Sequence, residues 1–265
     1  MITSFQIVDR GDKESQEMAE KFRATLTDHG FSLSNNPDLV ISIGGDGTML
    51  RCFRDYYSPS TAFVGLHTGT LGFYADWSKE EAGLLLHEIQ YGKPHFEKCP
   101  LIQGTFELLT GEKKTFLSLN EIIIKSNSIS TLVLDVKING EKFESFRGDG
   151  ILVSTPSGST AYNHSLMGSI MHPTLDAMQV TEMASINNSV YRTLNRSFIL
   201  PKEQHLILEF PTIDERAIVG IDGEEYHLKQ IKSIHVCVAD NKINFARYKP
   251  FPFWERVKGK FLKEM

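Results

Sequence analysis

The sequence predicts two domains of different class: an α/β domain with a parallel sheet, followed by a β-rich domain with mainly antiparallel strands. Over the first hundred residues short apolar runs alternate with helix-like stretches, which is the order of a parallel sheet covered by helices. From about Leu101 the apolar runs are separated by turn dipeptides instead. We expect the α/β domain at residues 1–98, the β-rich domain at 99–248, and a C-terminal helix packed back on the protein at 249–265.

Three strands and three helices are expected in the α/β domain. The strands are the apolar runs 5–8, 39–43 and 62–66. The first helix carries apolar residues four positions apart and stops at Gly30, and a second helix-like stretch separates the last two strands. A third helix begins at residues 78–81, where the spacing of Ser and Glu is that of a capping box.

The β-rich domain is expected to contain short strands joined by tight turns. Asn139-Gly140, Asp222-Gly223 and Asp240-Asn241 are typical turn dipeptides. They divide apolar runs at 116–125, 131–138, 142–146, 217–221, 231–238 and 243–248. Residues 157–190 favour helical or irregular structure that interrupts these strands.

The C-terminal segment predicts an amphipathic helix. Trp254, Val257 and Phe261 fall on one face, with basic residues around the rest. A helix lying on a membrane surface shares this pattern. Docking of the apolar face on the protein's own core is the more common outcome, and we expect it here.

Composition excludes several classes of function. The chain has 265 residues, 28 Lys and Arg against 33 Asp and Glu, and a net charge of -5, which disfavours a nucleic-acid binder. No leader segment and no apolar run of about 18 residues is present, so secretion and membrane insertion are disfavoured. Cys52, Cys99 and Cys237 are far apart, which argues against a zinc site, a redox motif or disulfides and indicates a cytoplasmic protein.

A glycine cluster follows the second predicted strand and leads into a helix. Gly44, Gly45 and Gly47 surround Asp46, and Thr48 comes next. Such a turn directs backbone N–H groups and the positive end of the helix toward a bound phosphate. Neither a Walker A loop nor a G-x-G-x-x-G pattern is present. Asp46 would bind a metal or accept a hydroxyl proton; alternatively, it only caps the helix.

A second glycine-rich turn, at residues 65–74, follows the third predicted strand and ends with Phe73 and Tyr74. In an open parallel sheet both turns lie at the carboxyl edge, where ligands bind. The two loops could therefore hold one ligand together. The alternative is an ordinary chain reversal with packing glycines.

Two polar segments interrupt the β-rich domain. Asn120 and Glu121 lie within an apolar run and could recognise ribose hydroxyls or a base, although exposure on an edge strand would also explain them. The segment 155–165 combines small hydroxyl residues with Tyr162, a composition suited to a narrow nucleotide pocket in which the ring stacks. The alternative is a loop that begins a helix at Ser159 or Thr160.

Other candidate sites have little support. His67, His164 and His172 do not form H-E-x-x-H, and no serine lies in a G-x-S-x-G elbow. Metalloprotease and hydrolase functions are therefore disfavoured.

Taken together, these motifs resemble the NAD kinase family. The resemblance rests on G-G-D-G-T at 44–48, N-E at 120–121 and T-P-S-G-S-T-A-Y-N-x-S at 155–165. It extends to F-R-G-D-G at 146–150, T-E-M-A-S-I-N-N at 181–188 and F-P-F-W at 251–254, and so covers nearly the full chain. One departure is Met167, where many members have a second glycine.

The resemblance implies a Rossmann-like α/β domain, a β-sandwich-like second domain, and transfer of the ATP γ-phosphate to the 2′-hydroxyl of the adenosine ribose of NAD. Asp46 would accept the proton, and a divalent cation, Mg²⁺, would accompany ATP. The substrate- and nucleotide-binding residues implied are Gly44, Gly45, Gly47, Thr48, Phe73, Tyr74, Asn120, Glu121, Arg147, Asp149, Ser157, Thr160, Ala161, Tyr162, Asn163, His164, Ser165, Ala184 and Ile186.

The resemblance also implies a homo-oligomer, dimer or tetramer, in which a neighbouring subunit completes the pocket. Arg147, Asp149, Ala184 and Ile186 would lie near that interface. No metal ligand and no role for Asp222 is assigned. The alternatives are a lipid or sugar kinase that shares only the first glycine loop, and a non-catalytic sensor of NAD or NADP, which would not need Asp46.

Overall fold

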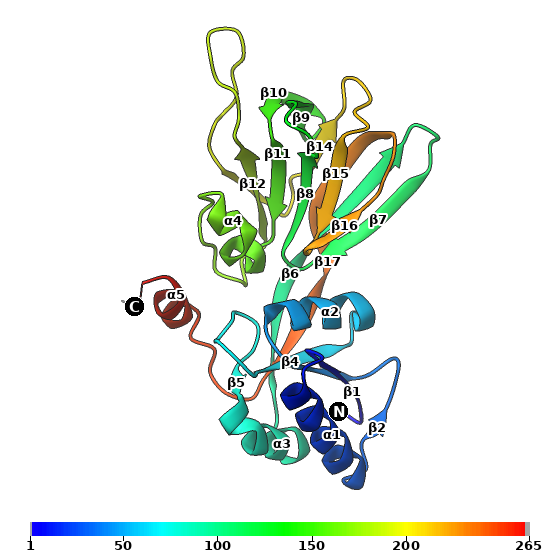
Figure 1. Ribbon diagram of the computed structural model, residues 1–265, viewed down its shortest axis with the longest axis vertical. Coiled ribbons are helices and arrows are strands. Elements are labelled where there is room, and N and C mark those ends of the chain that lie inside the picture. Colours follow the sequence, from blue (N-terminus) through cyan, green and yellow to red (C-terminus); the bar gives the residue numbers. More distant parts are fainter. Residues whose placement is uncertain (1, 263–265) are drawn as a thin grey trace. The chain divides into compact units, whose positions relative to one another are not determined.

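The computed structural model describes residues 2–262, which form two compact units (Figure 1). Unit 1 consists of the described residues up to Cys99 together with those from Lys242 onward, and unit 2 is Pro100–Asn241. The chain passes from one unit to the other within two long strands, β6 (His95–Leu108) and β17 (Ile231–Arg247). The domain boundaries expected at residues 98 and 248 stay a prediction.

Unit 1 is built on a parallel sheet. Strand β1 pairs with β2 and β3, β3 pairs with β4, and β4 pairs with β5 and with the end of β17, all in parallel. The bounds are β1 (Ser4–Asp9), β2 (Ser32–Leu33), β3 (Leu39–Ile43), β4 (Ala62–His67) and β5 (Trp77–Ser78). All five residues of β3 are buried, as expected for a strand covered on both faces. The predicted α/β class is confirmed.

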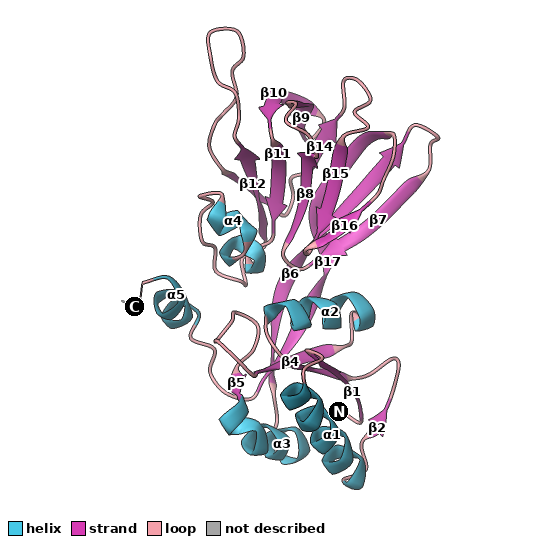
Figure 2. Ribbon diagram, in the orientation of Figure 1, coloured by secondary structure: helices cyan, strands magenta, loops and turns pink. Residues whose placement is uncertain are grey.

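Helices cover both faces of this sheet (Figure 2). Phe22 and Leu26 of α1 (Lys13–Asp28) and Leu85 of α3 (Ala82–Tyr91) share one apolar core with the strands. Figure 1 shows α2 (Asp46–Tyr56) on the opposite side of the strands. The predicted capping box is present at the short helix η1 (Lys79–Glu81), just before α3. Helix α5 (Phe253–Phe261) also belongs to unit 1.

Unit 2 consists of two antiparallel sheets. One has the order β13-β12-β11-β8-β15-β16; the other contains β10-β9-β14-β17, with β6 paired to β17 and β7. The bounds are β7 (Lys113–Ser118), β8 (Glu121–Ser126), β9 (Leu132–Ile138), β10 (Glu141–Gly148), β11 (Gly150–Ser154), β12 (Ala177–Met183), β13 (Phe198–Pro201), β14 (Leu206–Glu209), β15 (Ala217–Ile221) and β16 (Glu224–Tyr226).

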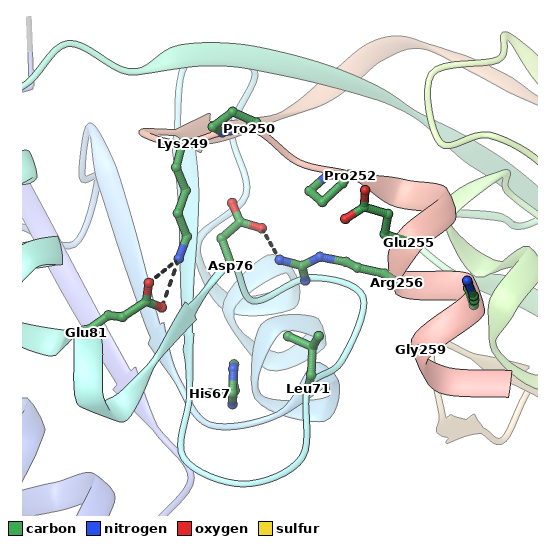
Figure 3. Close-up of a pocket in the computed structure, with 11 residues that line it drawn as sticks. His67, Leu71, Asp76, Glu81, Lys249, Pro250, Pro252, Glu255, Arg256 and Gly259 are labelled. Carbon is green, nitrogen blue, oxygen red and sulfur yellow. Dashed lines mark hydrogen bonds and ion pairs between the residues drawn. The ribbon is translucent and has the colours of Figure 1, made fainter. Parts of the chain in front are cut away.

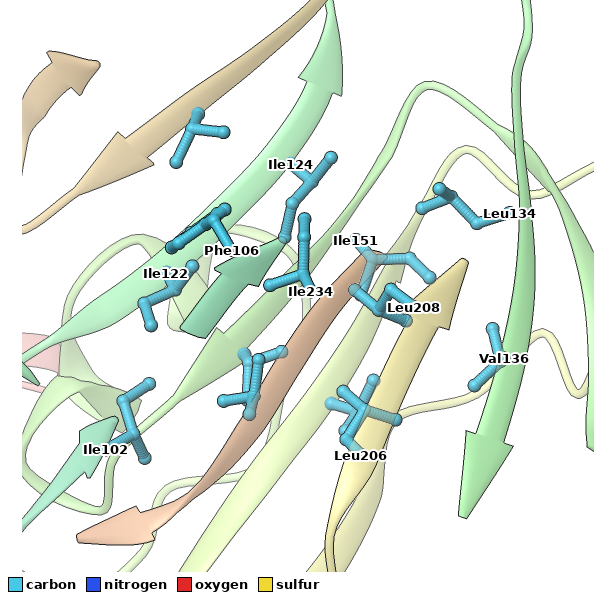
Figure 4. Close-up of a cluster of buried hydrophobic side chains, with 14 of the residues drawn as sticks. Ile102, Phe106, Ile122, Ile124, Leu134, Val136, Ile151, Leu206, Leu208 and Ile234 are labelled. Atoms are coloured by element: carbon cyan, nitrogen blue, oxygen red, sulfur yellow. The ribbon is translucent and has the colours of Figure 1, made fainter. Parts of the chain in front are cut away.

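The two sheets of unit 2 enclose one core (Figure 4). Ile122 and Ile124 of β8 are fully buried together with Leu206 and Leu208 of β14 and Ile234 of β17. Each such side chain contributes roughly 1.5–3 kcal/mol through removal of its apolar surface from water. The predicted β-rich, antiparallel second domain is confirmed. Two short helices, η2 (Ser157–Thr160) and α4 (Tyr162–Ser165), follow β11.

Two of the three predicted turns are present. Asn139-Gly140 and Asp222-Gly223 have φ of 52° and 86°, and of 50° and 84°, as a two-residue hairpin requires. The turn predicted at Asp240-Asn241 is wrong, because β17 is continuous through both residues. Both side chains are exposed, so they need no turn to reach water. This polar pair lies instead where the chain leaves unit 2.

Three other predictions need correction. The single strand expected at 116–125 is two strands, because the N–H groups of Leu119 and Asn120 donate to the carboxylate of Asp222 instead of to a neighbouring strand. Residues 157–190, predicted as helical or irregular, contain the helices η2 and α4 but also the strand β12. Trp254 is 58% exposed, and the buried face of α5 carries Phe253 and Val257.

Among residues 2–262, no helix has both the length and the apolar composition needed to cross a membrane.

Candidate active site

The first glycine turn joins β3 to α2 in a very compact form. The Gly44 N–H donates to the Leu66 carbonyl at 2.9 Å, which ties the turn to the neighbouring strand β4. A Cβ atom at Gly44 would lie 2.2 Å from Oγ1 of Thr48, so no larger residue fits there. A Cβ at Gly45 or Gly47 would meet no atom within 4 Å. These two glycines leave open space at the positive end of α2, where an anion is favoured.

Asp46 does not cap its own helix. The N-cap residue is Gly45, and Asp46 is the first residue of α2. Its carboxylate accepts the Phe73 N–H at 3.0 Å on both oxygens and the Tyr74 N–H at 3.0 Å on Oδ1. The capping interpretation is therefore wrong. Instead, the carboxylate is held by the second glycine turn, as expected if both turns lie at one edge of the sheet.

Gly72 makes this approach between the two turns achievable. A Cβ atom at Gly72 would lie 2.2 Å from Oδ1 of Asp46. The neighbouring rings are also anchored within unit 1: Phe73 stacks on Phe261 at 5.8 Å and Tyr74 on Phe245 at 5.7 Å. The backbone that holds the carboxylate is thus fixed by packing on both rings.

Arg256 on α5 holds the second glycine turn from the other side. Its Nη1 donates to the carbonyls of Gly72 at 3.2 Å and Ala75 at 2.6 Å, and its Nη2 donates to Oδ1 of Asp76 at 3.1 Å. Arg247 pairs with the same carboxylate at 2.8 Å. Both guanidinium groups are buried, so these contacts form in a low-dielectric environment where charged hydrogen bonds are strong.

A pocket of about 690 Å³ lies between this turn and the chain around α5 (Figure 3). Leu71 and Arg256 line it, and Lys249 pairs with Glu81 at 2.7 Å on its other side. Its remaining lining residues are His67, Asp76, Pro250, Pro252, Glu255, Lys258 and Gly259. Two carboxylates of the lining are paired with cations, Asp76 with Arg256 and Glu81 with Lys249, and Asp46 is not part of the lining. It therefore borders the carboxylate's supporting loop and does not surround the carboxylate.

In unit 2, Asp222 organises the predicted Asn120-Glu121 segment. Its carboxylate accepts Oγ of Ser118 at 2.6 Å and the N–H groups of Leu119 at 2.8 Å, Asn120 at 2.7 Å and Glu121 at 3.2 Å. Burial raises the pKa of the Asp222 carboxyl, although these donors oppose the shift.

Asn120 and Glu121 are buried, so exposure on an edge strand is wrong for both. Burial, and secondarily the charge of Asp222, raises the pKa of Glu121 to about 8. A carboxyl with this pKa is mostly protonated at neutral pH and can donate a hydrogen bond as well as accept one. Its Oε2 is buried without a hydrogen-bond partner among the described residues, which leaves that bond available to a ligand.

The segment after β11 packs directly against Asn120. The Thr155 N–H donates to the Asn120 carbonyl at 2.8 Å, and a Cβ at Gly158 would lie 2.0 Å from that oxygen. Oγ of Ser157 is buried without a partner among the described residues. Asn163 is fully buried and accepts Oγ1 of Thr181 at 2.7 Å, so its amide oxygen already has a partner inside unit 2.

Tyr162 and its neighbours are accessible. The Tyr162 side chain is 38% exposed, Ser165 is exposed, and Ala161 and His164 are half-buried. Thr160 is half-buried and donates through Oγ1 to the Ser157 carbonyl at 3.2 Å. The alternative of a helix that begins at Ser159 or Thr160 is wrong in its start positions, because the two short helices begin at Ser157 and Tyr162, and neither is capped by a side-chain hydroxyl.

The remaining predicted residues gather elsewhere in unit 2. The Ile186 N–H donates to the Arg147 carbonyl at 2.7 Å, and the Arg147 guanidinium lies 4.3 Å from the centre of the Tyr191 ring. Asp149 and Ala184 are exposed nearby, and Ala184 has φ of 46°, a strained value for a residue with a side chain.

Strand β11 separates these two groups of predicted residues. Gly150, beside Arg147 and Asp149, pairs with Lys125 and Met183, whereas Ser154 at the other end pairs with Glu121. Five extended residues span roughly 15 Å. Within one chain the structure therefore does not bring Arg147, Asp149, Ala184 and Ile186 together with Asn120 and Glu121.

Sequence reasoning missed Asp222, Thr155 and Arg256. Asp222 stands in a predicted Asp-Gly turn, and only the tertiary structure shows what its carboxylate contacts. Arg256 lies in the C-terminal helix, where the sequence suggests only one of several exposed basic residues around an apolar face. No local signal in the sequence identifies its buried contacts with Gly72, Ala75 and Asp76, which lie 180 or more positions earlier.

Comparison with known families matches both halves of the chain. Residues 6–93 match the ATP-NAD kinase N-terminal domain, and residues 119–248 match the ATP-NAD kinase C-terminal domain.

Curated relatives match over nearly their full length. NAD kinase 1 of Oceanobacillus iheyensis is 45% identical over 98% of this chain and 99% of its own length. The NAD kinase of Geobacillus stearothermophilus is 46% identical over 98% of this chain and 97% of its own length.

Solved structures share the fold at lower identity. Yeast NADH kinase in complex with NADH has a TM-score of 0.83 and 20% identity, covering 98% of this chain and 87% of the other. An NAD kinase from Archaeoglobus fulgidus in complex with ATP has a TM-score of 0.74 and 21% identity, covering 97% and 98%. Together with the two family matches and the curated relatives, these observations establish that the chain belongs to the NAD kinase family.

Proposed function

We propose that this chain transfers the γ-phosphate of ATP to the 2′-hydroxyl of the adenosine ribose of NAD, giving NADP and ADP, and that Asp46 accepts the hydroxyl proton. Membership of the NAD kinase family supports the reaction. The observation that carries the role of Asp46 is its carboxylate, which is held by the N–H groups of Phe73 and Tyr74 and not by its own helix.

The chemistry balances with few protein groups. The ribose oxygen forms a bond to the γ-phosphorus, the bond from that phosphorus to the β–γ bridging oxygen breaks, and ADP leaves. The hydroxyl proton moves to a carboxylate oxygen of Asp46, a role that contributes about 10²–10⁴ in rate. Phosphoryl transfer otherwise needs positioning and charge stabilisation. The open space at Gly45 and Gly47, at the N-terminal end of α2, suits the phosphates.

The dinucleotide would be held by unit 2. Asn120, Glu121 and the Ser157 hydroxyl supply polar groups, and the exposed ring of Tyr162 supplies a stacking surface. Thr160, Ala161 and Ser165 would line the same pocket. A buried carboxyl and hydroxyl with available hydrogen bonds suit a ribose or a base, and they argue against the acyl chain of a lipid-kinase substrate.

Magnesium would enter with ATP. The described residues around Asp46 form no protein cage for a cation, since the Asp46 carboxylate is occupied by two backbone N–H groups. Mg²⁺ commonly takes substrate phosphates and waters as ligands, with one or two carboxylates at most. We therefore assign the ion to the phosphates of ATP and derive no step through it.

A homo-oligomer, dimer or tetramer, would complete the pocket. The positions of Arg147, Asp149, Ala184 and Ile186, at the other end of β11 from Glu121, support a role toward the ligand of a neighbouring subunit. The three cysteines are free, which fits a cytoplasmic enzyme.

Replacement of Asp46 by Asn tests the proposal. The Asn side chain keeps one oxygen for the loop N–H groups but cannot accept a proton. We expect kcat for NADP formation to fall at least ~100-fold while the KM for NAD stays within threefold. Asp55→Asn, on the exposed side of the same helix, is the matched control and should keep wild-type activity. Asp46→Asn activity within threefold of wild type would exclude Asp46 as the base, and it would leave NAD phosphorylation itself intact.

A further inference from the structure

Three side chains of types that commonly ligate metals lie together on the outer face of unit 2. They are His205, just before β14, and His235 and Cys237 of β17. Their neighbours Val236 and Leu206 are buried in the core. Since side chains alternate across a strand, His235 and Cys237 share the opposite, outer face. None of the three has a role in the proposed phosphoryl transfer.

Strand pairing explains why these residues meet. Leu206 pairs with Val236 and Ile207 with His235, so His205 falls opposite Cys237 when the antiparallel register is continued by one residue. The imidazole rings of His205 and His235 stack with centroids 5.2 Å apart and an interplanar angle of 16°. A nitrogen of each ring and Sγ of Cys237 all lie within 4.8 Å of one another.

The backbone that carries these side chains is well fixed. The His205 N–H donates to Oδ1 of Asn139 at 2.9 Å, and the Asn139 N–H donates to the His205 carbonyl at 2.9 Å. Strand β14 lies between β9 and β17 and is hydrogen-bonded to both. Two of the three side chains therefore project from β17, and the third comes from the residue that leads into the neighbouring strand β14 and is hydrogen-bonded to Asn139, which is the kind of scaffold that a metal site requires.

We propose that His205, His235 and Cys237 bind one Zn²⁺ ion, with solvent as the fourth ligand. Tetrahedral zinc with bonds of about 2.0–2.1 Å to nitrogen and 2.3 Å to sulfur places its ligand atoms roughly 3.3–3.6 Å apart. From a separation of 4.8 Å or less, rotation of the side chains closes the remaining gap without movement of the strands. Binding converts the Cys237 thiol to a thiolate and releases its proton to solvent.

The donor set selects the class of metal. Imidazole nitrogen with thiolate sulfur is the combination that zinc prefers, whereas Mg²⁺ and Ca²⁺ require oxygen ligands. The site is therefore chemically distinct from the magnesium that accompanies ATP. Because it joins the residue before β14 to β17, the bound ion would cross-link the start of one strand to its neighbour and stabilise unit 2.

The test uses the full-length protein without an affinity tag, stripped with a chelator and desalted. Zn²⁺ is titrated in competition with a chromogenic chelator, and Co²⁺ is added separately as a spectroscopic probe. We compare wild type with His205→Gln and Cys237→Ser. His227→Gln, an exposed histidine in the same unit whose side chain is 81% exposed, is the matched control.

We expect wild type and His227→Gln to bind one equivalent of Zn²⁺ at micromolar concentration or below. Each ligand variant should bind at least ~10-fold more weakly. The Co²⁺ form should show a sulfur-to-cobalt charge-transfer band that Cys237→Ser lacks. Zn²⁺ should raise the melting temperature of wild type and His227→Gln but not of His205→Gln or Cys237→Ser. Thermal unfolding of each metal-free variant is measured as well, and a variant without a cooperative transition has failed to fold.

Three results would each overturn the proposal. The first is that wild type does not bind one equivalent of Zn²⁺. The second is equal affinity in wild type and both ligand variants, which would place the ion elsewhere. The third is a Co²⁺ complex with no thiolate band.

Discussion

Removal of the Arg256 guanidinium should lower catalysis through the loop that holds Asp46. In Arg256→Met the apolar stem is kept, but the carbonyls of Gly72 and Ala75 lose their shared donor. Hydrogen bonds to a charged group contribute about 1.5–3 kcal/mol each when buried, and the Asp76 carboxylate retains Arg247. We therefore expect a loss of roughly 3 kcal/mol in the free energy of unfolding, within the 5–15 kcal/mol typical of a domain.

The effect on kcat follows from the hydrogen bonds that the same loop makes to Asp46. The N–H groups of Phe73 and Tyr74, which hold the Asp46 carboxylate, lie between the two carbonyls that Arg256 binds. A displacement of about 1 Å at a reacting group can cost ~100-fold in rate. We expect kcat to fall about 10- to 100-fold, with less than a threefold change in the KM for NAD, and Arg256→Lys to restore only part of kcat.

Arg247→Met is the matched control for this experiment. Arg247 binds Asp76 and Glu97 from the same buried environment but donates to neither loop carbonyl. It should lose a similar amount of stability and keep most of kcat. Steady-state NADP formation, measured below the melting temperature of every variant, separates the two. If Arg256→Met loses stability but keeps kcat within threefold of wild type, the guanidinium supports only the fold and the reasoning is wrong.

Three further predictions concern single residues. Gly72→Ala should lower kcat at least ~10-fold, because the new Cβ would lie 2.2 Å from the Asp46 carboxylate. Gly83→Ala, with open space in a helix, is the control and should raise stability by up to about 1 kcal/mol. Equal activity in the two variants would contradict the close contact at Gly72. Glu121 has a pKa raised from 4.5 to about 8, so the folded state retains its proton while the unfolded state loses it, and stability should fall as pH rises from about 4.5 to 8. In Glu121→Gln the melting temperature should depend less on pH over this range. The same pH dependence in the variant and in wild type would refute the raised pKa. Tyr162→Ala should mainly raise the KM for NAD if the ring stacks on the ligand, whereas an unchanged KM with a lower melting temperature would indicate a packing role.

The order of the elements and most of the chemistry can be predicted from the pattern of residues alone. A buried strand is recognisable as a run of apolar residues, and for this reason the predicted strand 39–43 has the same bounds as β3. Positive φ favours glycine and asparagine, so Asn139-Gly140 is readable as a turn. The glycine turn around Asp46 and the N-E pair are compact in sequence, and they carried the family resemblance that the comparisons confirm.

The contacts of the polar groups, in contrast, depend on how the folded chain packs. The choice between capping and a catalytic position for Asp46 depends on residues 73 and 74, and the support of that loop depends on Arg256. Cysteine spacing argued against zinc, yet strand pairing brings Cys237 beside His205. Spacing along the chain cannot encode such contacts, because hydrogen bonds and metal coordination depend on distance in space, which is set when strands far apart in sequence pair and pack.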